Sequence, residues 1–413
     1  MAVAEPVVFT NAMVFDGVAA ELREASVLVQ GDRIDGIDDA PIRAENAHTI
    51  DVHGRTLMPG LIDAHVHAYL ADVNPLTAER LPMTFLAQRA GRMLEDVLRR
   101  GFTTVRDTGG GDYGLYLAIE RGLLAGPRLV YCGKALSQTG GHGDMRHPHE
   151  DELCTCPGGY VGSKLAHVVD GVDAIRHAIR EEFHRGAGFI KIMGSGGVAS
   201  VGDRLDTAQY ADEEIRAAVD ETERHGSYLT AHIHPDAALR RAIELGVHCI
   251  EHGTMISDET ARLAADRGTS IVPTLSVIKG LKEHGERLGF SSQSMAKLRV
   301  VEPVALEGVE RMRRAGITMG FGTDLIGELE RFQADEFAIR REVLPALEIL
   351  RSATSVNARI IRRQDQIGRI APGLLADLIV VDGNPLEDVS VFDEHGTRVP
   401  VVMKGGQIFK NEL

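Results

Sequence analysis

Cysteine is scarce in this sequence, with four residues among 413: Cys132, Cys154, Cys156 and Cys249. So few thiols at irregular spacing exclude a disulfide framework of the kind that holds small secreted domains together. Cys132 and Cys249 lie in apolar runs typical of strands, so we expect both to be buried free thiols. Cys154 and Cys156 lie in a polar stretch, and Cys-x-Cys is not a structural zinc spacing, so no role is assigned to this loop.

The sequence also lacks an excess of positive charge and any long apolar run. The 45 Lys and Arg residues are outnumbered by 60 Asp and Glu residues, which gives a net charge of −15 and a pI near 5.6. This balance excludes nucleic acid and anionic membrane surfaces as expected partners. No apolar run approaches the length of about 18 residues that a membrane-spanning helix requires. The opening residues MAVAEPVVFTNAMVFDG contain no basic leader, so we expect a cytoplasmic enzyme.

The two ends of the chain share a composition of short strands and turns. Residues 1–58 contain VVFTNAMVF and SVLVQGDRIDGI, and residues 366–413 contain GLLADLIVVDGNP and VPVVMKGGQIFKN. Such β-branched runs between Gly and Asp turns are typical of strands. Because chain ends often lie close together in a domain, we predict one small, discontinuous, β-sandwich-like domain formed from residues 1–58 and 366–413.

The middle of the chain, residues 59–365, alternates between apolar strand-like segments and helical patterns. The strand candidates are GLIDAHVH, FTTVRD, RLVYCGKAL, FIKIM, YLTAH, HCIEH, SIVPT and ITMGFGTD. Eight such strands predict an α/β fold, a (β/α)₈ TIM barrel. A doubly wound open sheet is the alternative, but no Gly-x-Gly-x-x-Gly turn follows the first strand. The polar connections 137–171 and 275–295 are predicted to be long loops at the carboxyl ends of the strands, where barrels place their active sites.

Metal-ligand residue types recur at the carboxyl ends of the predicted strands. His65 and His67 end the first strand, and residues two apart in a strand point to the same side. His232, His252 and Asp324 end the fifth, sixth and eighth strands. Each of these residues alone could be a buried histidine or a helix cap, but five such residues at four strand ends predict a metal site, because neutral imidazole and carboxylate bind divalent ions.

Lys191 lies in the middle of the strand FIKIM, between apolar neighbours. A lone buried ammonium is costly and cannot bind a metal, because it has only donors. Burial and nearby cations lower the pKa of an amine. The neutral amine can then react with CO₂ to give a carbamate, whose two oxygens can each bind one metal ion.

The six residues just described resemble the ligand set of the amidohydrolase superfamily: His65, His67, Lys191, His232, His252 and Asp324. The flanking segments MPGLIDAHVH, GFTTVRDTGG and GRIAPGLLADLIVVDGNP match as well, so the resemblance covers nearly the whole chain. Within the superfamily, SQTGGHGD and KIMGSGGVAS are similar to the binuclear, imidazolonepropionase-related subgroup that includes prolidase-like dipeptidases.

The resemblance implies two divalent ions, with zinc as the expected metal, that share a bridging hydroxide. It places His65, His67 and Asp324 on one ion, His232 and His252 on the other, and carboxylated Lys191 between them. Asp324 is the implied proton shuttle. His142 in the 137–171 loop is the first candidate to polarise the substrate carbonyl, and Tyr228 is the second. Arg106 and Arg204 are candidates for binding a substrate carboxylate, with a structural ion pair as the alternative for Arg106.

The favoured function is hydrolysis of a small-molecule amide. The subgroup indicates a dipeptidase acting on Xaa-Pro or Xaa-hydrophobic dipeptides, or a hydrolase of N-acyl amino acids and related aryl amides. A cyclic-amide hydrolase or a deaminase of the same superfamily is the first alternative, although these enzymes normally lack the lysine of the fourth strand. An inactive barrel that serves as a binding scaffold is the second alternative. We also expect a homo-oligomer, since related proteins often assemble.

Overall fold

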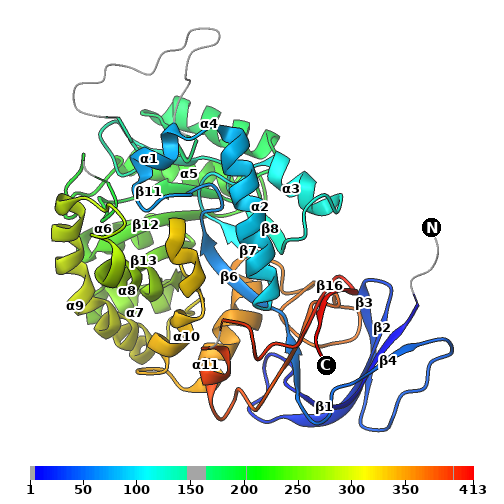
Figure 1. Cartoon of the computed structure of the whole chain (residues 1–413). Coiled ribbons are helices and arrows are strands. Elements are labelled where there is room, and N and C mark those ends of the chain that lie inside the picture. The colour runs from blue at the N-terminus through cyan, green and yellow to red at the C-terminus, as the bar shows by residue number, and fades with distance from the viewer. Residues whose placement is uncertain (1–4, 147–163, 201, 394) are drawn as a thin grey trace.

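The computed structural model describes residues 5–146, 164–200, 202–393 and 395–413 (Figure 1). It shows a mixed α/β fold with parallel sheets, which confirms the predicted class. Cys154 and Cys156 lie outside the described residues, whereas Cys132 and Cys249 are buried free thiols. Within the described ranges, no helix is both long enough and apolar enough to cross a membrane.

Strands from both ends of the chain form one eight-stranded sheet, with the order β17-β16-β15-β5-β1-β2-β3 and with β4 paired to β1. The strands are β1 Val7–Val14, β2 Arg23–Gln30, β3 Arg33–Asp38, β4 His48–Asp51, β5 Thr56–Pro59, β15 Leu378–Val381, β16 Val401–Lys404 and β17 Gln407–Asn411. The antiparallel pairing of β15 with β5, Leu378 opposite Pro59, joins the two ends. The predicted domain limits and the sandwich shape stay predictions.

The middle of the chain contains two parallel sheets, whose strands are almost entirely buried. A three-stranded sheet has the order β6-β7-β8, and a six-stranded sheet has the order β10-β9-β11-β12-β13-β14. Their bounds are β6 Leu61–Val66, β7 Phe102–Asp107, β8 Arg128–Tyr131, β9 Ala135–Ser137, β10 Ala166–Val168, β11 Ile190–Met193, β12 Leu229–Pro235, β13 Cys249–Met255 and β14 Ser270–Val272. Continuous apolar runs of this kind are expected where both faces of a sheet are covered.

Backbone hydrogen bonds through residues 318–324 connect the two parallel sheets. The N–H of Ile271, in β14, donates to the carbonyl of Thr318 at 3.1 Å. The N–H of Ala64, in β6, donates to the carbonyl of Phe321 at 2.8 Å. This segment runs parallel to β14 at the bridge between Ile271 and Met319, and β14 is parallel to β13 and β12. The segment therefore joins the two sheets, and the carboxyl ends of β6, β12 and β13 face the same side of the molecule.

Helices surround the parallel strands in Figure 1. They are α1 Pro75–Arg80, α2 Met83–Arg99, α3 Tyr113–Glu120, α4 Val172–His184, α5 Asp212–Arg224, α6 Asp236–Glu244, α7 Asp258–Arg267, α8 Leu275–His284, α9 Ser292–Ala315, α10 Asp335–Arg340, α11 Ala346–Arg351 and α12 Asn357–Ile360. Three short helical turns complete the elements: η1 Gly327–Phe332, η2 Ser352–Val356 and η3 Val389–Phe392. The prediction of a loop over 275–295 was wrong, because α8 and the start of α9 occupy most of it. Their apolar side chains pack into the core, which a polar loop composition does not reveal.

Candidate metal centre

One group of metal-binding side chains gathers at the end of β6. His65 lies in β6 and His67 directly follows it, while Asp324 is held beside them because its N–H donates to the His65 carbonyl at 2.8 Å. The Oδ1 atom of Asp324 lies 3.3 Å from the Nε2 atoms of both histidines. The ligand atoms of these three residues lie within 4.8 Å of one another, which is close enough for a single ion.

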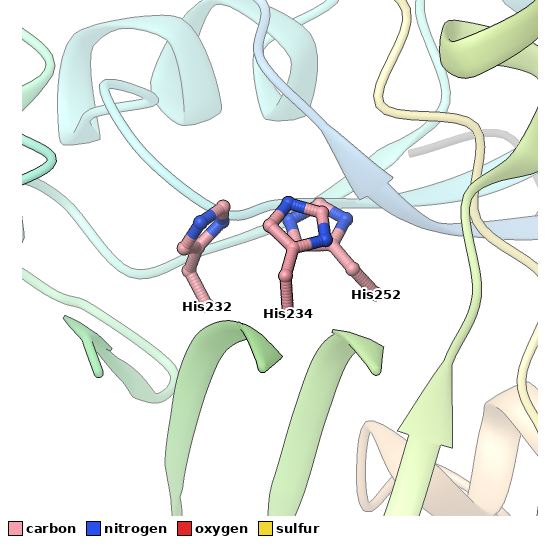
Figure 2. A group of neighbouring side chains, drawn as sticks. All are labelled: His232, His234 and His252. Carbon is pink, nitrogen blue, oxygen red and sulfur yellow. The ribbon is translucent and has the colours of Figure 1, made fainter. Parts of the chain in front are cut away.

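A second group consists of His232 and His234 on β12 and His252 on β13 (Figure 2). His232 and His234 share a face because they are two residues apart in the strand. The Nδ1 atoms of His234 and His252 are each 2.8 Å from a threonine hydroxyl, which leaves the Nε2 atoms for other partners. His234 is not among the ligands predicted from the sequence, although its spacing of two residues from His232 is the same as that between His65 and His67.

The two groups form one centre in the floor of a single cavity. The rings of His65 and His252, one from each group, have centroids 5.0 Å apart. All six side chains line a cavity with an empty volume of about 890 Å³, counting space open to solvent. The sequence prediction of five ligands at strand ends thus corresponds to residues that the structure brings together.

Two buried nitrogens in this centre indicate that it is built for metal ions. Within the described residues, neither His65 Nε2 nor His232 Nε2 has a hydrogen-bond partner, although Asp324 Oδ1 is 3.3 Å from the former. An unpartnered buried polar atom is costly, unless a ligand completes it. Burial lowers the pKa of both His232 and His252 well below the usual value, which favours the neutral imidazole that a metal requires.

Lys191 lies on β11 and lines the same cavity, with 2% of its surface exposed. No hydrogen bond or ion pair joins its ammonium to any residue in the described part of the chain. Burial lowers the pKa of Lys191, although the nearby Glu251 and Asp324 oppose this effect. Lys191 is opposite Thr230 in the parallel pairing of β11 with β12, the strand that carries His232 and His234. These are the surroundings that favour a reactive, neutral amine.

Two of the candidate ligands have a strained backbone. His252 has a φ of 72° and Asp324 has a φ of 54°, in the left-handed region that side chains other than glycine rarely adopt. Each such residue costs on the order of 1–3 kcal/mol. Strain of this kind concentrates at functional sites, because the surrounding structure must hold it in place.

A buried ion pair supports the first group from below. Glu251 accepts a hydrogen bond from Nδ1 of His65 at 2.7 Å and one from Nη2 of Arg106 at 2.6 Å. Because His65 donates through Nδ1, its Nε2 faces Asp324 with a free lone pair. Arg106 also donates to the Ala64 carbonyl at 2.6 Å and is fully buried, so it fits the structural alternative that the sequence left open.

His142 lies beside the second group and stacks on His232, with ring centroids 4.1 Å apart and planes 17° apart. Its Nδ1 is 2.8 Å from Ser200 Oγ and 3.5 Å from Asp203 Oδ2. His142 is 8% exposed and lines the cavity. This placement is compatible with the role of a hydrogen-bond donor to a substrate carbonyl.

Tyr228 and Arg204 do not reach the cavity. Tyr228 directly precedes β12, whose fourth residue is His232, and it packs between Phe189 and His248. Four residues of strand separate it from His232 by about 13 Å, although both point to the same face. Arg204 pairs with Asp206 on the surface, where 79% of its side chain is exposed. We therefore do not carry the expected roles of these two residues forward.

The wall of the cavity above the ligands is aliphatic. Its side chains include Leu70, Met145, Leu165, Val277, Ile278 and Leu298. Among the described residues that line it, Lys191 is the one lysine or arginine. The cavity therefore offers apolar surface around a polar floor.

Comparison with known proteins gives consistent matches along almost the whole chain. The amidohydrolase family model matches residues 56–408. Ochratoxinase of Aspergillus niger is 33% identical over 379 residues, which cover 89% of this chain and 77% of that protein. A crystal structure of an amidohydrolase is 46% identical with a TM-score of 0.96, and covers 99% of this chain and 100% of its own. A prolidase structure with bound N-methylphosphonate-L-proline is 45% identical with a TM-score of 0.95, and covers 98% of this chain and 100% of its own.

Proposed function

Because this chain belongs to the amidohydrolase family, as the sequence resemblance predicted, we propose that it is a hydrolase with two divalent metal ions that cleaves an amide bond in dipeptides or N-acyl amino acids. The observation that carries this proposal is the pair of adjoining ligand groups with the buried Lys191 beside them. A single-ion enzyme, as expected for a deaminase, would need only one of the two groups.

In this proposal, His65, His67 and Asp324 hold one ion, and His232 and His252 hold the other. The neutral amine of Lys191 would react with CO₂ to give a carbamate and a proton, and the carbamate would be a further ligand for the ions. His234 is available as a further ligand or substrate contact, since burial lowers its pKa to about 3 and keeps the ring neutral. When bound, such ions supply a water of lowered pKa and a Lewis acid for the carbonyl group.

In this proposal, two side chains carry out proton transfer and polarisation of the substrate carbonyl. Asp324 accepts a proton as the water attacks and delivers it to the leaving amine. Burial raises the pKa of Asp324, but His65 and His67 outweigh this effect and keep the carboxylate ionised. His142 directs a nitrogen at the position of the substrate carbonyl oxygen, where negative charge develops.

The aliphatic wall supports a substrate with apolar groups around the scissile amide. Covering such groups excludes water, which strengthens the polar interactions on the cavity floor. The similar proteins include an ochratoxinase and a prolidase, and both names fit hydrolysis of an amide flanked by an apolar group. We accordingly favour Xaa-Pro and Xaa-hydrophobic dipeptides and N-acyl derivatives of apolar amino acids.

The proposal also includes the closed barrel, the identity of the metal, the oligomeric state and the cellular location. The hydrogen bonds of residues 318–324 to β14 and β6 support the closed (β/α)₈ barrel. Zinc as the native metal, the homo-oligomer and the cytoplasmic location stay predictions.

Two measurements test the proposed function together. Elemental analysis of the purified protein should find about two divalent ions per chain, and a panel of Xaa-Pro dipeptides, Xaa-Phe dipeptides and N-acyl-phenylalanines should include substrates. Removal of the metal with a chelator should abolish hydrolysis, and zinc or manganese should restore it. One ion per chain together with deaminase activity would favour the alternative, and an inactive protein without metal would favour the scaffold.

A further inference from the structure

A buried hydrogen-bond network lies behind His142, on the side away from the metal-binding histidines. Its members come from three separate parts of the chain: His142, the neighbouring residues Gly197, Ser200, Asp203 and Gln209, and Lys297 of α9. None of these residues besides His142 was singled out by the sequence, and the proposed chemistry uses none of them directly. The network is therefore unexplained by the proposed function.

Asp203 is the centre of this network and is 7% exposed. Its Oδ2 atom accepts hydrogen bonds from the N–H of Gly197 and from Nε2 of Gln209, both at 3.2 Å, and lies 3.5 Å from Nδ1 of His142. Its Oδ1 atom accepts a hydrogen bond from Ser200 Oγ. Burial raises the pKa of Asp203, but the hydrogen bonds from His142, Ser200 and Lys297 outweigh it, so the carboxylate stays ionised.

Lys297 ties this carboxylate to α9. Its Nζ donates to Asp203 Oδ1, to the Gly197 carbonyl and to the Ser200 carbonyl, each at 2.9 Å. The ammonium thereby uses all three of its protons on one loop. A lysine that is 9% exposed and fully bonded fixes the loop to the helix rather than solvating the surface.

The arrangement leaves the His142 ring one orientation. Nδ1 is bonded to Ser200, and the face of the ring lies against His232. A Cβ atom added at Gly197 would lie 2.5 Å from Nε2 of His142 and 2.5 Å from Nε2 of His232. The two Nε2 atoms thus border the same spot, and the glycine is required because any side chain there would displace a ring.

We propose that Asp203 and Lys297 are positioning residues, which hold His142 so that its Nε2 faces the substrate carbonyl beside His232. Ser200 transmits the position, because it bonds Nδ1 of His142 and Asp203 at the same time. The inference rests on the proposed function, since it assigns these residues a task in the same reaction. Neither residue touches the substrate, so both act through His142.

Kinetics of Asp203→Asn test the inference. Asparagine keeps the shape but removes the charge, and loss of such a supporting partner costs about 10- to 100-fold in rate. We expect kcat on Leu-Pro or N-acetyl-phenylalanine to fall by this factor, with KM within about twofold and metal content unchanged. Asp206→Asn is the matched control, because Asp206 is in the same loop but 65% of its side chain is exposed. The control should retain full activity.

A double-mutant cycle separates positioning from general structural support. In a His142→Ala background, Asp203→Asn should have no further effect on kcat, because its effect passes through the missing ring. Lys297→Met should lower kcat and Lys297→Arg should restore most of it. Additive effects in the cycle, or a kcat of Asp203→Asn within about twofold of the parent, would overturn the inference.

Amide hydrogen exchange provides a readout that does not depend on turnover. Lys297→Met should increase exchange in residues 196–200, since the Gly197 and Ser200 carbonyls and the Gly197 N–H lose their anchored partners. Lys282→Met, which removes an exposed partner of Glu302, is the control. If the parent hydrolyses no amide, the proposed function fails, whereas unchanged exchange in Lys297→Met contradicts the anchoring itself.

Discussion

Glu251→Gln removes the charge from the most deeply buried ion pair below the metal centre. Glu251 and Arg106 are both fully buried, and the glutamate also receives the Nδ1–H of His65. A glutamine retains one acceptor oxygen, so either Arg106 or His65 faces an amide donor. Breaking a buried pair by removal of one partner costs about 3–5 kcal/mol. Because one acceptor survives, we expect a loss of about 3 kcal/mol in the free energy of unfolding of the metal-free protein.

The same substitution should weaken metal binding. A histidine ligand that loses its supporting carboxylate typically loses about 10- to 100-fold in metal affinity. Denaturant unfolding of the metal-free protein and competition with a chelator measure the two effects separately. Glu307→Gln is the matched control, because Glu307 forms an exposed pair with Arg311 that contributes about 0–0.5 kcal/mol.

The pH dependence gives this prediction a second test. Burial raises the pKa of Glu251, but Arg106 and His65 outweigh it and lower the pKa from 4.5 to about 2. A carboxylate with a lowered folded-state pKa contributes stability that is complete above its unfolded pKa and is lost as the pH falls toward the folded value. The difference between the parent and Glu251→Gln should therefore be constant above about pH 5 and should shrink between about pH 4.5 and 2. A difference below 1 kcal/mol at neutral pH would falsify the role assigned to this pair.

Three further predictions follow from the site. Lys191→Ala should remove most of the bound metal and activity, and small carboxylates should partly restore both; an active variant with two ions would contradict the binuclear site. His142→Ala should lower kcat by about 10²–10³ with the metal content still near two, whereas a kcat within about threefold of the parent would remove His142 from the mechanism. Tyr228→Phe should leave kcat and metal content unchanged, because Tyr228 lies outside the cavity that the candidate ligands line; a kcat loss beyond about tenfold would restore Tyr228 as a candidate.

The residues that line the candidate metal centre could be predicted from the sequence because strand alternation and strand ends are local features; their role as ligands stays a proposal. His65, His67, His232 and His252 each end a short apolar run, and a parallel sheet brings such ends to one edge. Lys191 stood out because a charge in the middle of an apolar strand contradicts its surroundings. These signals need no knowledge of the tertiary structure.

The hydrogen-bond network behind His142 could not be predicted, because it depends on contacts between segments that are distant in the sequence. Asp203 and Lys297 lie in a loop and in a helix with ordinary polar neighbours, so no periodicity marks them. Tyr228 was a candidate from the resemblance alone, and the structure places it at the amino end of β12, away from the cavity. His234 was missed although its spacing from His232 is the same as that of His65 and His67.

The pairing of β5 with β15 has a consequence for the order in which the molecule is completed during synthesis. β6, which carries His65, begins two residues after β5 ends, whereas β15 to β17 are translated after every candidate metal ligand. The nascent chain can thus contain the whole ligand set while β5 still has an open edge. Unpaired edges promote association between chains. We therefore expect β15, once it is synthesised, to cover the edge of β5 and to protect the nascent chain from association through that strand.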